Sequence, residues 1–171
     1  SANDFIGHPE FIVCIANCCS GNGPRAIYYA WREALDFDRG GMIWMFDRPT
    51  LRVNLLFNRA SDWADIDSHI PYSGQVDVRV KMNIMVEVRL PDYVEPHEVT
   101  CRVDGKPREL MFKGRYAQVG EVDKDQVATL EFPMPERAQK VLIQGPPGGE
   151  VEYTLVLRGN SVVSIDPPGE Y

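Results

Sequence analysis

The chain has 171 residues and a mass of 19.3 kDa, enough for one good-sized domain or one domain with an appendage. Apolar residues make up 44% and charged residues 25%, the usage of a soluble globular core. Its formal net charge of −7 is the wrong sign for binding a nucleic-acid backbone, and it has no apolar run of membrane-spanning length. We therefore expect neither nucleic acid nor membrane as a partner.

The first predicted element is a helix that begins near Pro24 and ends at Arg39-Gly40-Gly41. Proline suits the first helical turn, and glycine commonly follows the last one. Apolar side chains recur between these limits at the spacing of one helix face. The residues of this predicted buried face are Ile27, Ala30, Trp31, Ala34 and Leu35.

Short β-rich runs separated by turn residues follow from Met42 onward, and we predict no second helix there. The clearest runs are Gln75–Lys81 and Ile84–Leu90, in which apolar and polar residues alternate. Asp104-Gly105 predicts a type I′ hairpin turn. The other predicted strands are Met42–Phe46, Leu51–Phe57, Glu98–Val103, Glu109–Phe112, Tyr116–Val119, Val127–Phe132, Lys140–Ile143, Val151–Leu157 and Ser161–Ile165. About ten strands at this spacing predict a mainly β protein, an antiparallel β-sandwich preceded by one N-terminal α-helix.

Four cysteines are present, and three of them, Cys14, Cys18 and Cys19, lie within six residues. Their density is too low for a disulfide scaffold, and adjacent cysteines rarely pair with each other. Such a thiol cluster favours metal ligation or nucleophilic chemistry in a reducing environment. An equally open interpretation is that these are small buried apolar residues near a helix start.

Three other groups of residues have both a functional and a structural interpretation. Asp62, Asp65 and Asp67 resemble part of a calcium loop only faintly, so we expect a solvated acidic loop. Trp63 could stack on a sugar ring or lie buried under a loop. The histidines are isolated from one another in the sequence and are expected on the surface or in packing roles; they are His8, His69 and His97.

The order of several short motifs resembles glycoside hydrolase family 127, formerly a domain of unknown function. Asn17–Arg25 contains C-C-x-x-N-x-x-R at the start of a helix, as at the end of that family's helical-barrel catalytic domain. The later motifs follow in the same order as in the family: the strand start Val53–Phe57, the Tyr-Pro-x-x-Gly-like turn Ile70–Val76, the strand end Val88–Pro91, the Val-Asn-Gly-Lys-like Val103–Lys106 and the late strand Arg158–Val163.

The resemblance implies a retaining glycosidase that acts on β-L-arabinofuranosides and uses a zinc-bound cysteine as nucleophile. It implies that Cys18 is the nucleophile, that Cys18 and Cys19 bind zinc, and that Asn22 and Arg25 orient or bind the sugar. An ordinary polar residue at a helix start and a surface arginine are the alternatives for Asn22 and Arg25. The chain departs from the family in having Cys-Cys-Ser-Gly in place of Cys-Cys-Pro-Pro. It also lacks the family's Glu-x-Cys ligand pair and its acid/base glutamate upstream of the cysteines.

We therefore interpret the chain as the C-terminal portion of such a glycosidase, itself structural and inactive. Residues 1–40 would end the barrel domain and residues 41–171 would form the sandwich. The expected partners are a carbohydrate in the parent, the missing catalytic barrel and a second copy through the exposed helix. Zinc is expected in the intact parent, with no cofactor in this chain alone as the alternative. Free thiols favour the cytoplasm.

A second hypothesis is a non-catalytic carbohydrate-binding or interaction module that uses the surface of the sandwich. Exposed, coplanar aromatic side chains would favour it, and their burial would count against it. The candidates for such a platform are Trp44, Trp63, Tyr72, Tyr93 and Tyr116.

Overall fold

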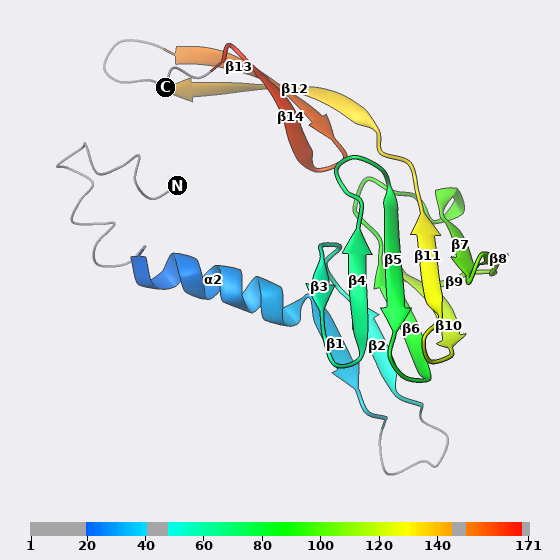
Figure 1. Cartoon of the computed structure of the whole chain (residues 1–171). Coiled ribbons are helices and arrows are strands. Elements are labelled where there is room, and N and C mark those ends of the chain that lie inside the picture. The colour runs from blue at the N-terminus through cyan, green and yellow to red at the C-terminus, as the bar shows by residue number, and fades with distance from the viewer. Residues whose placement is uncertain (1–19, 41–47, 145–149, 169–171) are drawn as a thin grey trace.

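The computed structural model describes residues 20–40, 48–144 and 150–168. These residues form the α-helix α2 (Ser20–Glu33), the short 3₁₀-helix η3 (Pro96–Glu98) and fourteen strands in three sheets (Figure 1). The mainly β fold predicted from the sequence is confirmed. The described ranges hold four strands that the sequence did not predict: β1 (Leu35–Asp38), β3 (Arg59–Ala60), β4 (Ala64–Ser68) and β8 (Lys106–Pro107). The predicted strand Met42–Phe46 and Trp44 lie outside the described residues.

Two of the sheets pack face to face as a sandwich (Figure 1). The five-stranded sheet has the order β1, β2 (Thr50–Val53), β6 (Ile84–Arg89), β10 (Tyr116–Val122), β9 (Met111–Lys113). The six-stranded sheet has the order β3, β4, β5 (Gln75–Val80), β11 (Val127–Glu131), β7 (Thr100–Val103), β8. Their inner faces form one apolar core, because side chains of a strand alternate between its two faces.

The predicted alternation in β5 and β6 is confirmed. Val76, Val78 and Val80 are fully buried, while Asp77 and Arg79 lie on the outer face. The hairpin turn between β7 and β8 is also confirmed: Asp104 and Gly105 have φ angles of 48° and 76°, as a type I′ turn requires. Period-two patterning and turn chemistry therefore located these elements correctly.

Strand pairing is antiparallel with one exception among the described strands, because β2 and β6 run parallel. Thr50 pairs with Met85 and Val53 with Val88. A parallel pair needs a long crossover connection. In this chain the crossover is not a helix but the strands β3, β4 and β5, which belong to the opposite sheet.

The predicted end of the helix was wrong. Helix α2 ends at Glu33, and the next residues enter the sandwich as strand β1, with Leu35 opposite Val53 of β2. Leu35 is buried by this pairing, whereas Ile27 and Trp31 are 73% and 47% exposed. The predicted buried helix face is therefore divided: its last two residues, Ala34 and Leu35, join the sandwich, and the rest projects from it (Figure 1).

The predicted acidic loop was wrong in part, since Asp65 and Asp67 lie in strand β4. Ala64 and Ile66 alternate with them and are buried in the core. Asp65 pairs with Lys81 at 2.7 Å. The burial of two apolar side chains on the inner face accounts for a strand in so acidic a segment.

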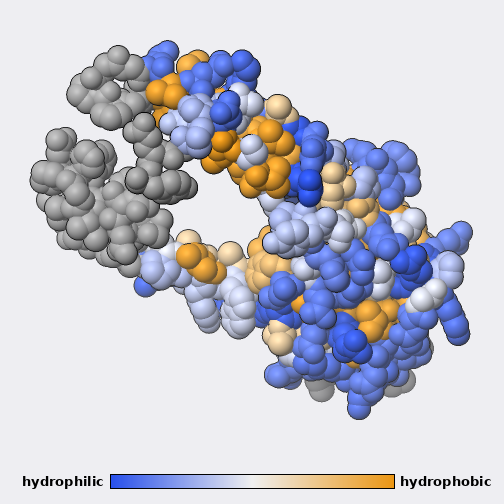
Figure 2. All heavy atoms as spheres, turned by 45° about the horizontal axis from the view of Figure 1, so that its top comes forward, coloured by the Kyte–Doolittle hydropathy of each residue, from blue (hydrophilic) through white to orange (hydrophobic). Residues whose placement is uncertain are grey.

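A three-stranded sheet extends from one end of the sandwich; it consists of β12 (Glu136–Gln144), β13 (Glu150–Arg158) and β14 (Ser161–Asp166). It meets the sandwich at the turn after β13. There Gly159 donates its N–H to the carbonyl of Pro135 at 2.9 Å. Gly159 has a φ of +57°, and a Cβ at this position would lie 2.7 Å from the Cζ atom of Tyr93. Figure 2 shows apolar surface on this sheet and on α2.

Candidate functional site

The predicted catalytic and zinc-binding residues cannot be placed, since Cys14, Cys18 and Cys19 lie outside the described residues. The two predicted sugar-binding residues are placed: Asn22 and Arg25 lie in the first half of α2, and both are exposed. The helix begins at Ser20, directly after Cys18 and Cys19 in the sequence. The structure thus shows the helix that follows the cysteine pair and the part of the sandwich that contacts this helix.

The C-terminal end of α2 is held by two polar side chains of the sandwich. Arg59 donates through Nη1 to the carbonyl oxygens of Trp31 and Arg32, at 2.5 and 3.0 Å. Its guanidinium also lies over the Trp31 ring, with Cζ 4.4 Å from the ring centroid. Asn54 donates to the carbonyl of Glu33 at 2.9 Å. The last carbonyls of a helix have no partner within it, and a cation there complements the helix dipole. Arg59 and Asn54 therefore cap the helix and fix it to the sandwich.

We expect Arg59→Ala to loosen α2 without unfolding the sandwich. The substitution removes two charge-assisted hydrogen bonds and a cation–π contact, together about 1–2 kcal/mol. Amide hydrogen exchange over the last turn of α2 should accelerate about tenfold or more. Arg79→Ala, on the exposed outer face of β5, is the matched control. Equal exchange rates in the two variants would mean that Arg59 does not anchor the helix.

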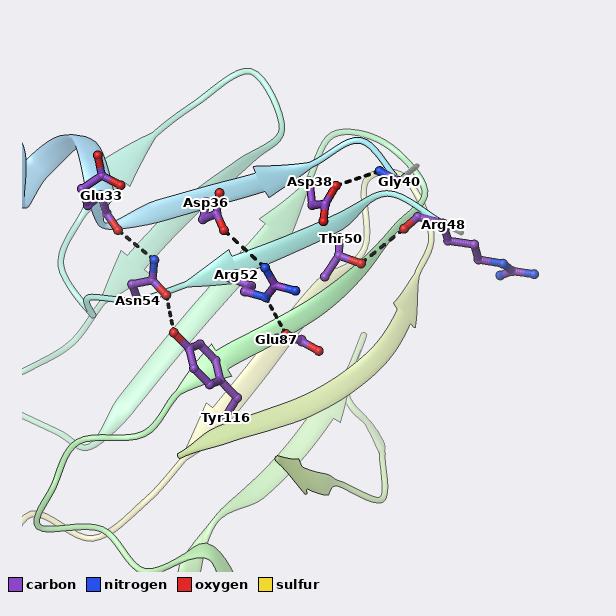
Figure 3. Close-up of polar contacts among 10 residues, drawn as sticks. All are labelled: Glu33, Asp36, Asp38, Gly40, Arg48, Thr50, Arg52, Asn54, Glu87 and Tyr116. Carbon is purple, nitrogen blue, oxygen red and sulfur yellow. Dashed lines mark hydrogen bonds and ion pairs between the residues drawn. The ribbon is translucent and has the colours of Figure 1, made fainter. Parts of the chain in front are cut away.

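A row of polar side chains crosses the outer face of the five-stranded sheet, and Figure 3 shows three of them, Asp36, Arg52 and Glu87. The row contains Asp36, Arg52, Glu87 and Gln118, which face one another on the adjacent strands β1, β2, β6 and β10. Arg52 donates to Glu87 at 2.9 Å and to Asp36 at 3.4 Å, and Gln118 donates to the second carboxylate oxygen of Glu87 at 3.0 Å. Both oxygens of Glu87 are thus held in place.

The protonation state of Glu87 follows from these contacts. Burial by itself would raise the pKa of its carboxyl, but the hydrogen bonds from Gln118 and Arg52 outweigh burial, and the pKa is lowered. The pKa of Arg52 is raised, chiefly by its hydrogen bond to Glu87. The row is therefore a fixed arrangement of charged groups at neutral pH.

A cavity of about 560 Å³ adjoins this row, and we call it the Glu87 groove. Glu87, Gln118, Met85, Met111, Arg48 and Thr50 contribute to its walls. Beside it, strand β10 contains a bulge at Gly120, whose φ is +83°. Arg108 donates to the carbonyls of Val119 and Glu121 on either side of Gly120, at 3.3 and 3.2 Å. Bulges are common next to binding sites because they redirect side chains.

A smaller cavity of about 300 Å³ lies near the capped end of α2. Asn54, Arg89, Asp92 and Asn160 contribute its polar groups. Asn54 links the two regions, since its side-chain oxygen accepts from the Tyr116 hydroxyl at 2.7 Å while its amide group caps the helix. The cavity is thus bounded in part by the residues that orient α2.

The aromatic residues that could form a sugar platform are dispersed among the described residues. Trp63 stacks on Phe37 with ring centroids 4.6 Å apart, and both pack against the core. The hydroxyl of Tyr93 donates to the sulfur of Met134, and Tyr116 is bonded to Asn54. Tyr72 is 88% exposed. Among the described candidates, only the ring of Tyr72 is exposed, so these residues do not form the platform of exposed rings that the binding-module hypothesis requires.

His69 contacts Asp77 on the outer face of the six-stranded sheet, with Nε2 3.0 Å from Oδ2. Asp77 also accepts from Thr129 and Gln75, at 2.6 and 2.9 Å. Burial would raise the pKa of Asp77, but these hydrogen bonds and His69 together lower it. His69 has the surface role that we expected from the sequence.

The part of the chain that the structure describes contains neither a metal-binding cluster nor a reactive thiol. No three side chains of His, Cys, Asp or Glu come together there as metal ligands. Cys101 is buried, and burial raises the pKa of its thiol to about 11, so it stays protonated and unreactive at neutral pH. No described helix has the length and apolar character needed to cross a membrane.

Solved structures of glycoside hydrolases are similar to this chain. One glycoside hydrolase has a TM-score of 0.58 and 22% identity; the match covers 90% of this chain and 26% of that one. Ara127N, a GH127 β-L-arabinofuranosidase from Geobacillus stearothermophilus T6, has a TM-score of 0.43 and 17% identity over 66% of this chain and 20% of that one. A second GH127 β-arabinofuranosidase has a TM-score of 0.43 and 18% identity, and the match covers 66% of this chain and 22% of that one. No family model and no curated protein matches the chain.

The chain shares its fold with a part of that first glycoside hydrolase. The similarity to this first neighbour, with its TM-score of 0.58, carries the conclusion. The chain spans about a quarter of the length of the first neighbour. The expectation that it corresponds to a part of a larger glycosidase is consistent with this coverage.

Sequence reasoning missed the capping residues and the polar row. Arg59 and Asn54 lie more than twenty residues from the carbonyls they cap, and such contacts leave no local pattern. A weak signal exists for Glu87, since it occupies an outward position of the alternating run Ile84–Leu90. Its partners Arg52 and Gln118 come from other strands and become neighbours only through the sheet order.

Proposed function

We propose that this chain is the C-terminal portion of a retaining glycosidase that acts on β-L-arabinofuranosides, and that it has a structural role in that enzyme. In this proposal the residues up to Ala34 end the helical catalytic domain, and the sandwich domain begins at Leu35, the first residue of β1, rather than at residue 41. The similarity of 90% of the chain to 26% of a glycoside hydrolase carries the proposal. The motif order from Asn17 to Val163 supports the choice of family.

The structure of α2 supports this role for the helix. It is capped firmly at the sandwich, while Ile27, Tyr28 and Trp31 remain about half exposed or more. Large apolar side chains on an isolated helix are commonly covered by a partner. A helical catalytic domain would cover them and receive the residues before Ser20 at a fixed position.

In this proposal the Cys18 thiolate attacks the anomeric carbon and displaces the aglycone, whose oxygen takes a proton from an acid of the catalytic domain. Water then breaks the bond between sulfur and the anomeric carbon, releases the sugar and restores the thiolate. Cys18 and Cys19 would hold zinc together with ligands of the catalytic domain, and zinc would favour the deprotonated form of these thiols at neutral pH. Asn22 and Arg25 hydrogen-bond the sugar or orient the turn. The acid/base glutamate and the Glu-x-Cys ligand pair of this mechanism belong to the catalytic domain, so we expect the chain alone to be inactive.

The test is a kinetic assay of the intact protein on 4-nitrophenyl β-L-arabinofuranoside. We expect hydrolysis by the intact protein and none by this chain alone. Cys18→Ala should lower kcat/KM by about 10³-fold or more, as expected for loss of a nucleophile. Cys19→Ala should lower the zinc content measured by elemental analysis.

Cys101→Ala is the matched control, because Cys101 is a buried thiol of the sandwich core. It should leave both kcat/KM and zinc content unchanged. An intact protein that lacks glycosidase activity, or one whose activity survives Cys18→Ala, would refute the proposal.

A further inference from the structure

The Glu87 groove lies on the sandwich itself and is built from β2, β6, β9 and β10 and from the residues that directly precede β2 and β9. We propose that it is a non-catalytic binding site for a neutral saccharide. The proposal does not depend on the role of Cys18, because every residue that carries it belongs to the described sandwich. Four features of the groove support the proposal: its volume, its fixed polar groups, its balanced charge and its methionine side chains.

The volume of the groove suits a small ligand. At about 560 Å³ it falls within the range of 300–1,000 Å³ that is usual for ligand sites. The groove lies over the outer face of adjacent strands, so its floor is a rigid sheet rather than a loop. Binding therefore requires little ordering of the protein.

The polar groups of the groove are fixed before any ligand arrives. Glu87 is held at one oxygen by Arg52 and at the other by Gln118. Only 16% of its side chain is exposed. Each carboxylate oxygen has a further lone pair, and the Gln118 amide retains a free oxygen and a second N–H. The pair thus offers both acceptors and a donor, as sugar hydroxyls require.

The charge balance of the groove favours an uncharged ligand. Two arginines, Arg48 and Arg108, and two glutamates, Glu87 and Glu109, line it, so their formal charges cancel. Arg48 forms an ion pair with Glu121, and Arg108 donates to the backbone at the bulge. Each arginine charge of the groove is thus accompanied by a carboxylate, Glu121 beside Arg48 and Glu109 on the same wall as Arg108, so the groove has no net positive charge to select a phosphate or carboxylate.

Two methionines supply the apolar part of the groove. Met111 is 71% exposed on the edge strand β9, and Met85 is partly buried on β6. Thioether side chains are soft and adaptable, and they can pack against the C–H face of a sugar ring. A ligand whose surface alternates hydroxyl and C–H groups matches this lining better than a fully apolar one does. The groove thus achieves, without an aromatic ring, the mixed surface that saccharides bind.

The test is a titration of this chain with arabinotriose, followed by NMR of methyl-labelled methionines. We expect saturable shifts of the Met85 and Met111 methyl signals. Met134 lies against the core, bonded to Tyr93, and should serve as an unshifted reference. Gln118→Ala should weaken binding about tenfold. The substitution removes the hydrogen bond that positions Glu87 and the proposed hydrogen bond from Gln118 to the sugar. Met111→Ala, at an exposed edge position, should also weaken it without affecting the fold.

Gln75→Ala is the matched control. Gln75 donates to Asp77 on the opposite sheet, at 2.9 Å, just as Gln118 donates to Glu87. It should leave the affinity for arabinotriose unchanged. The proposal is overturned if the methionine shifts do not saturate, if both Gln118→Ala and Met111→Ala bind like the unmodified chain, or if inorganic phosphate moves the same signals at lower concentration.

Discussion

Gly74→Ala should destabilise the sandwich by about 3 kcal/mol or more. A Cβ at Gly74 would lie 1.9 Å from the carbonyl oxygen of Phe132, a backbone atom that no rotamer change can move away. The same two residues share a hydrogen bond, in which the Phe132 N–H donates to the Gly74 carbonyl at 2.8 Å. The added methyl must therefore separate the turn before β5 from the end of β11. Thermal denaturation should show a Tm lower by roughly 6–12 °C.

Gly23→Ala is the control for adding one methyl group. No atom lies within 4 Å of a Cβ built at Gly23, which is part of helix α2. Alanine is the better helix former by about 1 kcal/mol, so the variant should be neutral or slightly stabilised. If both variants have the Tm of the unmodified chain, then Gly74 does not lie as close to the Phe132 carbonyl as in this structure.

Leu130→Ala should cost about 2–5 kcal/mol, the usual range for truncating a buried leucine. Leu130 is fully buried on β11, a central strand of the six-stranded sheet. It lies opposite Val76 of β5 and Cys101 of β7, so the cavity left by truncation would lie inside the core. Urea denaturation should show a lower midpoint with an unchanged slope, because the surface exposed on unfolding stays the same.

Leu142→Ala is the matched truncation at an exposed site. Leu142 is 65% exposed on the three-stranded sheet, so its loss should change the free energy of unfolding by no more than about 0.5 kcal/mol. Equal midpoints for the two leucine variants would show that Leu130 does not belong to the core of the sandwich.

The parts of the fold that the sequence predicted are those that depend on local pattern. The valines of β5 alternate with polar residues, and one face of the sheet is buried, so the strand is visible in the sequence itself. The end of α2 was not visible. Leu35 fits both the apolar stripe of a helix and the inner face of a strand. Its pairing with Val53, eighteen positions further along the chain, decides between them.

The candidate site divides in the same way. The cysteine pair is visible in the sequence as a local motif, and its role stays a prediction because both residues lie outside the described part of the chain. The groove depends on Arg52, Glu87 and Gln118, whose hydrogen bonds join residues 35 and 31 positions apart. No local pattern encodes such contacts, because they arise only from the order of strands in the sheet. Longer-range strand order is what a single sequence specifies least directly.

The parallel pairing of β2 with β6 has a consequence for how the domain folds. Between these two strands the chain crosses to the opposite sheet, forms β3, β4 and β5 there, and returns. The pairing of β2 with β6 therefore forms together with the opposite sheet. Such non-local pairing implies slow, highly cooperative assembly of the sandwich as one unit. The sheet β12–β14 is instead a meander of sequential neighbours, whose pairing is local. The two parts should therefore differ in folding rate, with the meander able to form and open while the interlocked sheets remain intact.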